Sequence, residues 1–196
     1  MRNATTKRAQ SKQESLDRIL EAAARRLREE GLDGAGIVPV MNDAGLTHGA
    51  FYSHFENKDE LANAAFSRAI STGRPRWIKP MRGESWATRL TSLAKRYLTT
   101  AHRDDLSTSC AFAALSADAA RASEDFRTVY ERELRGSLTA ICGEEDSERL
   151  DDAIALMAVC VGGLSLARAV ADPRFSARIL RVARGAAAKL AEAQQD

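Results

Sequence analysis

The sequence predicts an all-α protein, and three observations lead to this prediction. The chain has 196 residues but only 4 prolines and 12 glycines, so long stretches contain no helix breaker. Alanine, leucine, arginine and glutamate dominate, and these residues lose little conformational entropy in a helix. Apolar residues recur at spacings of three and four along most of the chain, as they do on one face of an α-helix. We therefore expect about nine helices, in a small N-terminal domain and a larger second one.

Residues 1–13 are polar and basic and offer nothing to bury, which predicts a flexible arm. Between Arg2 and Arg28, eight lysines and arginines stand against three acidic residues. This arm has two equally good interpretations: a solubilising tail, or a segment that contacts a nucleic acid. The net charge of the whole chain is only +2, so charge does not decide between them.

Three helical patterns come next. A first helix is expected over about 15–30, where Gly31 ends it. Two unusually short patterns follow, at 37–44 and 47–55. Short helices are unstable alone, so these two must pack on the first helix and on another that begins near Lys58.

The second part of the chain begins with a break. Pro75 and Pro80 predict a linker or helix interruption over about 73–83. Beyond it, helices are expected at about 84–101, 105–118, 123–141, 147–170 and 174–193. The helix at 147–170 is apolar over more than one face, which indicates burial in the core or between subunits.

The two short patterns satisfy the requirements of a helix-turn-helix. Gly45 supplies the turn residue that can adopt a positive φ. The inward apolar positions are Ile37, Val40, Met41, Leu46, Phe51 and Phe55, and the outward or helix-start positions are Thr47, His48, Gly49, Ala50, Tyr52, Ser53 and His54. The alternative is an ordinary pair of helices in a bundle. Such a pair has no need to combine these inward positions, this turn and this outward face, so the helix-turn-helix is the better interpretation.

The outward residues have chemistry suited to DNA. Thr47 is expected at the N-cap, where its hydroxyl and the nearby amides could hold a phosphate. Gly49 and Ala50 would let the backbone approach base edges closely. Tyr52, His54 and Lys58 can reach phosphates, which positions a helix without reading sequence.

The segment AGLTHGAFYSHFENKDEL resembles the signature of the TetR/AcrR family, in the subset with the LTHG-FY-HF variant. The resemblance implies a three-helix DNA-binding domain over residues 14–60 and a helical-bundle domain for ligand binding and dimerisation over 61–196. It also implies a homodimeric, ligand-responsive transcription repressor that binds a palindromic operator in double-stranded DNA, with no cofactor. The DNA-binding role is carried to Thr47, His48, Gly49, Ala50, Tyr52, His54 and Lys58.

Two positions depart from the family pattern. Gly36 stands where many members have threonine, so one phosphate contact is absent. Pro39 lies in the first turn of a short helix, where its missing N–H had no helical partner anyway. Neither departure threatens the fold.

The middle helices carry candidates for a ligand pocket. Core packing explains each of them equally well. The candidates are Phe66, Trp77, Trp86, Tyr97, Cys110, Phe112, Phe126 and Tyr130. Cys110 lies in a segment that resembles the start of an effector-domain helix of the same family subset. It could react with electrophiles, but a small buried core residue is the favoured interpretation.

By the same resemblance, the last two helices form a four-helix dimer interface with those of a second copy. The expected interface residues are Ile154, Met157, Ala158, Val161, Gly162, Phe175, Ile179 and Val182. A packing surface within one chain is the alternative for these residues.

Other classes of protein fit less well. The three cysteines lack CxxC spacing, and His48 and His54 are six residues apart, so no metal site is expected. No catalytic constellation favours a helical enzyme. The uncharged run over 153–167 is too short to span a bilayer and the N-terminus lacks an apolar signal segment, so a cytoplasmic protein is expected. A helical ligand-binding dimer without DNA function remains the alternative.

Overall fold

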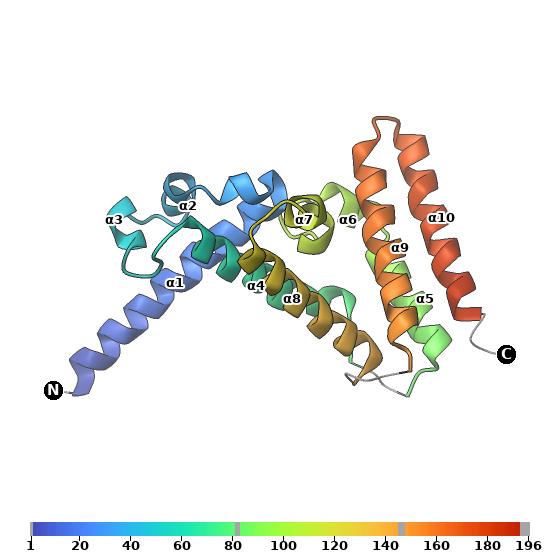
Figure 1. Cartoon of the computed structure of the whole chain (residues 1–196), viewed down its shortest axis with the longest axis horizontal. Helices are drawn as coiled ribbons and strands as arrows, with labels where there is room; N and C mark the ends of the chain where they lie inside the picture. The colour runs from blue at the N-terminus through green and yellow to red at the C-terminus, as the bar shows by residue number, and fades with distance from the viewer. Residues whose placement is uncertain (1, 81–82, 145–147, 193–196) are drawn as a thin grey trace.

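The computed structural model describes residues 2–80, 83–144 and 148–192, and these ranges contain ten α-helices, one 3-10 turn and no strand (Figure 1). The all-α prediction is confirmed, with one helix more than the nine expected. The elements are α1 (Arg2–Glu30), η1 (Leu32–Ala35), α2 (Ile37–Asp43), α3 (His48–Phe51), α4 (Lys58–Trp77), α5 (Trp86–Tyr97), α6 (Thr100–Asp104), α7 (Ala111–Ala119), α8 (Glu124–Cys142), α9 (Leu150–Ala169) and α10 (Pro173–Glu192).

The first helix begins much earlier than the sequence predicts. Residues 2–13 are helical and continuous with the rest of α1, where the sequence predicts a flexible arm. No glycine or proline interrupts residues 2–30, and side-chain bonds from Gln10 to Glu14 and from Gln13 to Asp17 join successive turns. The apolar pattern could not locate the start of the helix because residues 7–13 are exposed.

Two of the expected boundaries in the middle of the chain are also corrected. α4 continues through Pro75 to Trp77, so the break expected over 73–83 begins only after that residue. The helix expected over 84–101 is divided, because α5 ends at Tyr97 and the Thr99 side chain caps a new helix, α6.

The helix expected over 105–118 begins only at Ala111. The Asp105 carboxylate holds the preceding residues in a turn, since it accepts hydrogen bonds from the Thr108 amide, the Thr108 hydroxyl and the Ser107 hydroxyl. These three bonds hold the pKa of Asp105 down to about 2. Side-chain bonds of this kind compete with helix formation.

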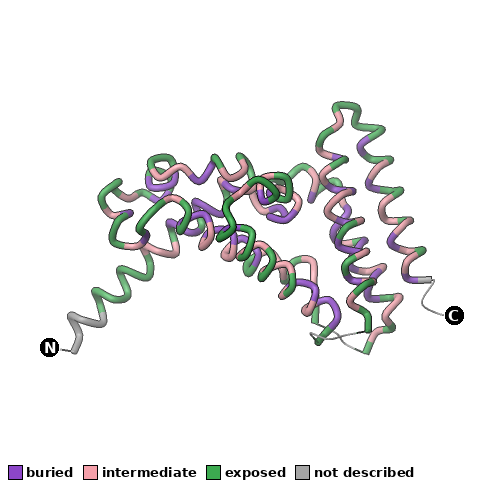
Figure 2. Tube along the Cα trace, viewed as in Figure 1, coloured by how far each residue is buried: buried purple, intermediate pink, exposed green. Residues whose placement is uncertain are grey.

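The helices form an elongated molecule (Figure 1). α1 to α3 lie at one end, α4, α7 and α8 lie in the middle, and α5, α9 and α10 lie side by side at the other end. Buried positions follow the inner faces of the helices from one end to the other (Figure 2), so one continuous core supports both ends. In this core, Ile19, Ala23 and Leu27 of α1 pack in the same cluster as Leu61 and Ala65 of α4.

A buried charge helps to join α5 to α8. Arg89 is 2% exposed and pairs with Glu84 at 2.9 Å. Its guanidinium also donates to the carbonyls of Ala140 and Ile141, at 2.8 and 2.6 Å. These carbonyls lie in the last turn of α8 and have no acceptor role within the helix, so Arg89 both satisfies them and faces the negative end of the helix dipole.

The packing of α9 on α10 depends on a glycine. A Cβ atom on Gly163 would lie 2.7 Å from the Cβ of Ala183 and 3.2 Å from Leu98. α9 is also the one helix within the described ranges that is long and apolar enough to cross a membrane by length and composition. Seven of its residues are buried inside this chain, as expected for the core helix of a helical bundle.

Candidate nucleic-acid interface and apolar cavity

The first short helix of the expected helix-turn-helix is anchored on α1. Val40 and Met41 are buried, as the pattern predicts. On the same helix, the Asp43 carboxylate accepts hydrogen bonds from Arg25 and Arg26 at 2.9 and 3.0 Å. Apolar contact and a double ion pair therefore fix the orientation of α2.

The turn has the geometry that the sequence predicts. Gly45 has a φ of 65°, in the left-handed region that favours glycine. The Leu46 amide donates to the Met41 carbonyl at 2.9 Å, which closes the end of α2. A side chain at position 45 would meet no neighbour, so backbone conformation and not space requires the glycine.

The second helix, α3, is shorter than the expected 47–55. It ends at Phe51, and turns carry the chain onward through the bonds from the His54 and Phe55 amides to the Phe51 carbonyl. Phe51 and Phe55 are buried at 0% and 6% exposure and pack on each other with ring centroids 5.6 Å apart. These two rings attach α3 to the core and leave its other face outside.

The outer face of α3 presents small and polar residues. Thr47, His48, Gly49 and Tyr52 are exposed, Tyr52 by 62%, whereas Ala50 and His54 are half-buried. Thr47 occupies the N-cap, but its hydroxyl makes no capping bond, and a Cβ on Gly49 would meet no atom within 4 Å. The side chains of His48 and Tyr52 meet edge to face at 5.6 Å.

Lys58 is the first residue of α4 and lies near this face. Asn57 caps the helix by accepting from the Glu60 amide at 2.9 Å, and the Glu60 carboxylate accepts from the Glu56 amide at 2.7 Å. The ammonium of Lys58 has a long contact of 3.8 Å to the exposed Asp33 carboxylate. So loose an ion pair leaves Lys58 free to bind an anion.

An open groove separates the N-terminal part of α1 from α3, and the apolar pattern gave no sign of it. Its lining residues are Lys7, Arg8, Ser11, Lys12 and Ser15 of α1 with Ala50, Ser53 and His54. Partial burial and the charge of Lys12 lower the pKa of His54. The basic charges beside α3 come from the helical extension that the sequence predicts as an arm.

The expected ligand-pocket residues do not all meet. Tyr97, Cys110 and Phe112 line an inner cavity of about 30 Å³ between the middle helices. Phe112 and Tyr130 line an adjoining apolar groove of about 200 Å³. Phe66 and Phe126 line neither space but pack behind them, with Phe66 stacked on Tyr130 at 5.3 Å.

Trp86 is placed elsewhere. It is the first residue of α5, its indole N–H donates to the Asp152 carboxylate at 2.8 Å, and the Arg149 guanidinium lies over its ring at 5.1 Å. The sequence included Trp86 with the pocket because it is aromatic, but it joins α5 to α9. Trp77, at the end of α4, does line the cavity. The sequence candidates missed the aliphatic and polar lining, which includes Ile70, Arg74 and Ser137.

The thiol of Cys110 is buried at 7% exposure. Burial raises its pKa, which is the opposite of what activates a cysteine. This environment supports the interpretation as a core residue.

The residues expected at a dimer interface lie on α9 and α10. Ile154, Phe175 and Val182 are exposed by 47%, 50% and 57%, which is unusual for large apolar side chains, and Ala158 is also exposed. Met157 differs, because it is buried and lines the inner cavity and the groove. Val161, Gly162 and Ile179 are half-buried. No group of histidine, cysteine and carboxylate side chains in the described ranges could hold a metal ion.

Residues 19–65, which contain the helix-turn-helix, match the sequence model of the bacterial regulatory proteins of the tetR family. The N-terminal domain is of the TetR type. The match ends within α4, so it does not extend to the apolar cavity or to α9 and α10. A comparison with curated proteins gave no match.

Solved structures extend the likeness in fold over most of the chain. Reduced NemR of E. coli has a TM-score of 0.71 at 18% identity, over 88% of this chain and 94% of that one. A transcriptional regulator from Rhodococcus sp. Rha1 has a TM-score of 0.61 at 25% identity, over 88% and 95%. GusR of Salmonella enterica has a TM-score of 0.64 at 17% identity, over 91% and 95%. The fold is that of TetR-family regulators, and a DNA-binding transcriptional regulator fits it.

Proposed function

We propose that this protein is a homodimeric transcription repressor, which binds a palindromic operator through α3 and is released by a small-molecule effector. The observation that carries the proposal is the outer face of α3. There, Thr47, His48, Gly49 and Tyr52 stand exposed on a helix that Phe51 and Phe55 fix to the core. A major groove admits a helix whose short and polar side chains face outward in this way.

The residues around α3 support contact with the phosphate backbone. Lys7, Arg8 and Lys12 line the groove beside α3, and Lys58 begins α4 nearby. Phosphate contacts position a protein on DNA, whereas contacts with base edges specify the sequence. We assign the lysines and the arginine, together with Tyr52 and His54, to contacts with phosphates. The start of α3 is assigned to contacts with base edges.

The exposed apolar face of α9 and α10 supports the dimer. Ile154, Phe175 and Val182 are costly to leave in water, and a second copy of the same face would cover them. A dimer with two-fold symmetry would place two copies of α3 in successive major grooves, about 34 Å apart. Two-fold symmetry of the operator follows from this arrangement.

The salt dependence of binding to duplex DNA tests the proposal against a ligand-binding dimer without DNA function. Each phosphate contact releases counterions, so affinity should fall steeply between about 50 and 200 mM salt. Replacing Lys12 by Gln should reduce the slope of log affinity against log salt by about one. The control is Lys189→Gln, an exposed lysine near the end of α10, which should leave the slope unchanged. Absence of binding at every salt concentration would contradict the proposal.

A further inference from the structure

Two buried hydrogen-bond donors beside the inner cavity lack a strong acceptor among the described residues. They are the Tyr97 hydroxyl and the Trp77 indole N–H, and both side chains line the cavity. Tyr97 is 2% exposed. Burial is the main reason that the pKa of Tyr97 is raised, and a hydrogen bond with the neighbouring Cys110 thiol adds to the shift. A thiol is a weak acceptor, so this bond satisfies the hydroxyl poorly. Buried polar groups are nearly always hydrogen-bonded, so these two donors need an explanation.

The two donors are held in fixed positions. The Trp77 ring stacks on His102 with centroids 3.9 Å apart, and Tyr97 meets both rings edge to face at 5.4 and 4.6 Å. His102 is itself fixed, because its Nδ1 bonds the Tyr97 carbonyl at 2.7 Å and its Nε2 accepts from the Cys110 amide at 3.1 Å. Both donor atoms are covered by neighbouring atoms of the protein. An acceptor that reached them would find them already ordered, which reduces the entropic cost of binding.

The inner cavity adjoins a larger apolar space. The cavity holds about 30 Å³, enough for a single small polar group, and the groove beside it holds about 200 Å³. Phe112 and Met157 line both spaces. The groove is otherwise lined by Tyr130, Leu134, Leu138, Ile154, Ala158 and Val161, and the last three also belong to the proposed dimer interface, which borders the groove. The Tyr130 hydroxyl is already bonded to Ser116 at 2.8 Å, so the groove offers mainly apolar contact.

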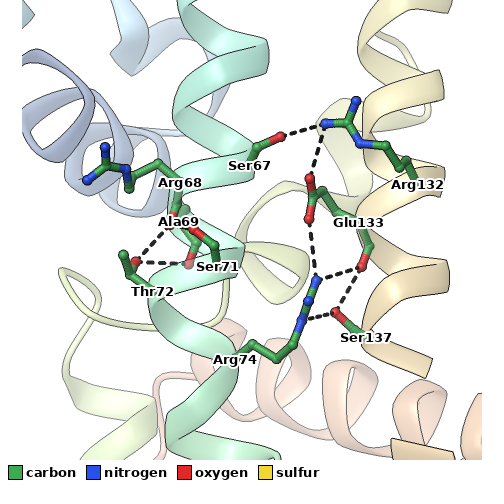
Figure 3. A network of polar contacts seen from close by, with 9 residues as sticks. All are labelled: Ser67, Arg68, Ala69, Ser71, Thr72, Arg74, Arg132, Glu133 and Ser137. Atoms are coloured by element: carbon green, nitrogen blue, oxygen red, sulfur yellow. Dashed lines mark hydrogen bonds and ion pairs between the residues drawn. The ribbon is translucent and has the colours of Figure 1, made fainter. Parts of the chain in front are cut away.

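The charge next to the cavity is already neutralised. Arg74 lines the cavity, but its guanidinium donates to the Ser137 hydroxyl at 3.1 Å and to the Glu133 carboxylate at 3.3 Å (Figure 3). Glu133 also accepts from Arg132, which bonds Ser67 on α4. An anionic ligand would have to displace Glu133 from this network, so the cavity favours an uncharged one.

We infer that the cavity and groove bind a small uncharged molecule with one ring and a carbonyl or similar acceptor oxygen. The oxygen accepts from the Tyr97 hydroxyl and the Trp77 N–H, and the ring lies in the groove beside Phe112 and Met157. A space of this size takes one ring but not a drug-sized molecule, which needs roughly 300 Å³ or more. Calling this molecule the effector rests on the proposed function.

Three matched probes test the inference on the full-length protein: acetophenone, ethylbenzene and benzoate. Each has a single aromatic ring. Acetophenone carries a neutral acceptor oxygen, ethylbenzene carries no acceptor, and benzoate carries a charged one. The chain has two tryptophans, so in a Trp86→Phe variant the fluorescence reports Trp77 alone. Thermal shift of the unmodified protein gives a second readout. Acetophenone should bind roughly five- to tenfold more tightly than ethylbenzene, as one or two buried hydrogen bonds warrant, and benzoate should bind more weakly than acetophenone.

Substitution of single hydroxyl groups completes the test. Tyr97→Phe should remove most of the preference for acetophenone over ethylbenzene. The matched control is Tyr52→Phe, which removes the hydroxyl of an exposed tyrosine that lines neither space and should keep the preference. Trp77→Phe should also reduce the preference for acetophenone over ethylbenzene. Thermal shift measures binding to this variant, because it lacks the fluorescence of Trp77. An unchanged preference in Tyr97→Phe, a preference for benzoate, or binding of none of the probes would overturn the inference.

Binding of the probes is measured without DNA, so the two proposals can fail separately. A protein that prefers acetophenone as described but never binds DNA would contradict the proposed function and support the cavity assignment. A protein that binds DNA but shows no preference among the probes would contradict the cavity assignment alone.

Discussion

His102 joins three parts of the chain without carrying a charge. Its ring nitrogens bond the backbone of Tyr97 at the end of α5 and of Cys110 at the start of α7, and its ring stacks on Trp77 of α4. Burial is the main reason that its pKa falls from 6.5 to about 4. The Nε2 atom must stay unprotonated to accept from the Cys110 amide, so protonation breaks a contact between helices.

The lowered pKa predicts a loss of stability in mild acid. The unfolded chain binds a proton at His102 below about pH 6.5, whereas the folded chain binds one only near pH 4, so stability falls as the pH drops between these values. The free energy of unfolding should decrease by roughly 2 kcal/mol from pH 7 to pH 5 through this group. Urea unfolding at both pH values measures the decrease. His102→Gln should lose most of this pH dependence, whereas in His48→Gln it should persist; an equal dependence in all three proteins would refute this explanation.

The cysteines are expected to be unreactive in the folded protein. Cys110, Cys142 and Cys160 are buried, and burial raises the pKa of Cys160 to about 12. Thiolates are the reactive form, so alkylation by N-ethylmaleimide at pH 7.5 should be far slower in the native protein than in urea. Mass spectrometry of the labelled protein counts the modified sites. Rapid and selective labelling of native Cys110 would revive its interpretation as a sensor of electrophiles.

At the scale of single elements, α9 uses opposite sides for different contacts. Gly163 and Ala167 are buried and face the interior of this chain, whereas Ala158 and Leu166 are exposed. The close approach of α10 at Gly163 leaves no room for a methyl group against Ala183. The small residues of α9 therefore serve packing within the chain as well as the proposed contact between chains.

Gly163→Ala is expected to destabilise the protein by about 1–3 kcal/mol, because α10 must shift to admit the methyl group. Gly185→Ala is the matched control on the neighbouring helix, where a Cβ meets no atom within 4 Å. This control should be neutral or stabilising by up to about 1 kcal/mol, since alanine is the better helix former. Chemical unfolding compares the two variants. A stabilised Gly163→Ala protein would mean that α9 and α10 are not packed as described.

At the scale of the whole molecule, two connections join the candidate DNA interface to the cavity. One is α4, which begins at Lys58 beside α3 and ends at Trp77 in the cavity. The other is α7, where the Asp118 carboxylate accepts from the Leu32 amide at 3.1 Å, next to the end of α1. A ligand that moves either helix could therefore change the position of α3, which is what an effector-released repressor requires.

The exposed apolar face of α9 and α10 predicts the oligomeric state. Phe175→Glu together with Val182→Glu should convert the proposed dimer to a monomer, because two buried charges would oppose association. Light scattering after size-exclusion chromatography measures the mass. Val38→Glu changes an apolar residue that is 55% exposed at the other end of the molecule and should leave the dimer intact. A parent protein that is already monomeric would contradict the proposed interface.

Local patterns predicted the helix-turn-helix well. Burial of Val40, Met41, Phe51 and Phe55 and the positive φ of Gly45 follow from short-range periodicity and turn chemistry. The assignment of the outward residues to DNA contacts stays a prediction.

Tertiary packing explains what the sequence could not predict. The periodicity identified α9 as buried but could not show that Met157 reaches the inner cavity, whereas Ile154 lines only the outer groove and stays exposed. Aromatic character alone could not separate Trp86 from Trp77. The buried Arg89 also gave no signal, because its partners at the end of α8 are distant in sequence.

The central claim is that α3 reads a DNA sequence, and selection of bound sequences from random duplex DNA tests it most directly. The parent protein should enrich a palindrome, and the affinity for that palindrome should fall in Tyr52→Ala through a lost phosphate contact. In His48→Ala, the preference at individual base positions should also relax, by about 1–3 kcal/mol for a lost base contact. Failure of the parent to enrich any sequence, or enrichment that neither substitution alters, would contradict the claim.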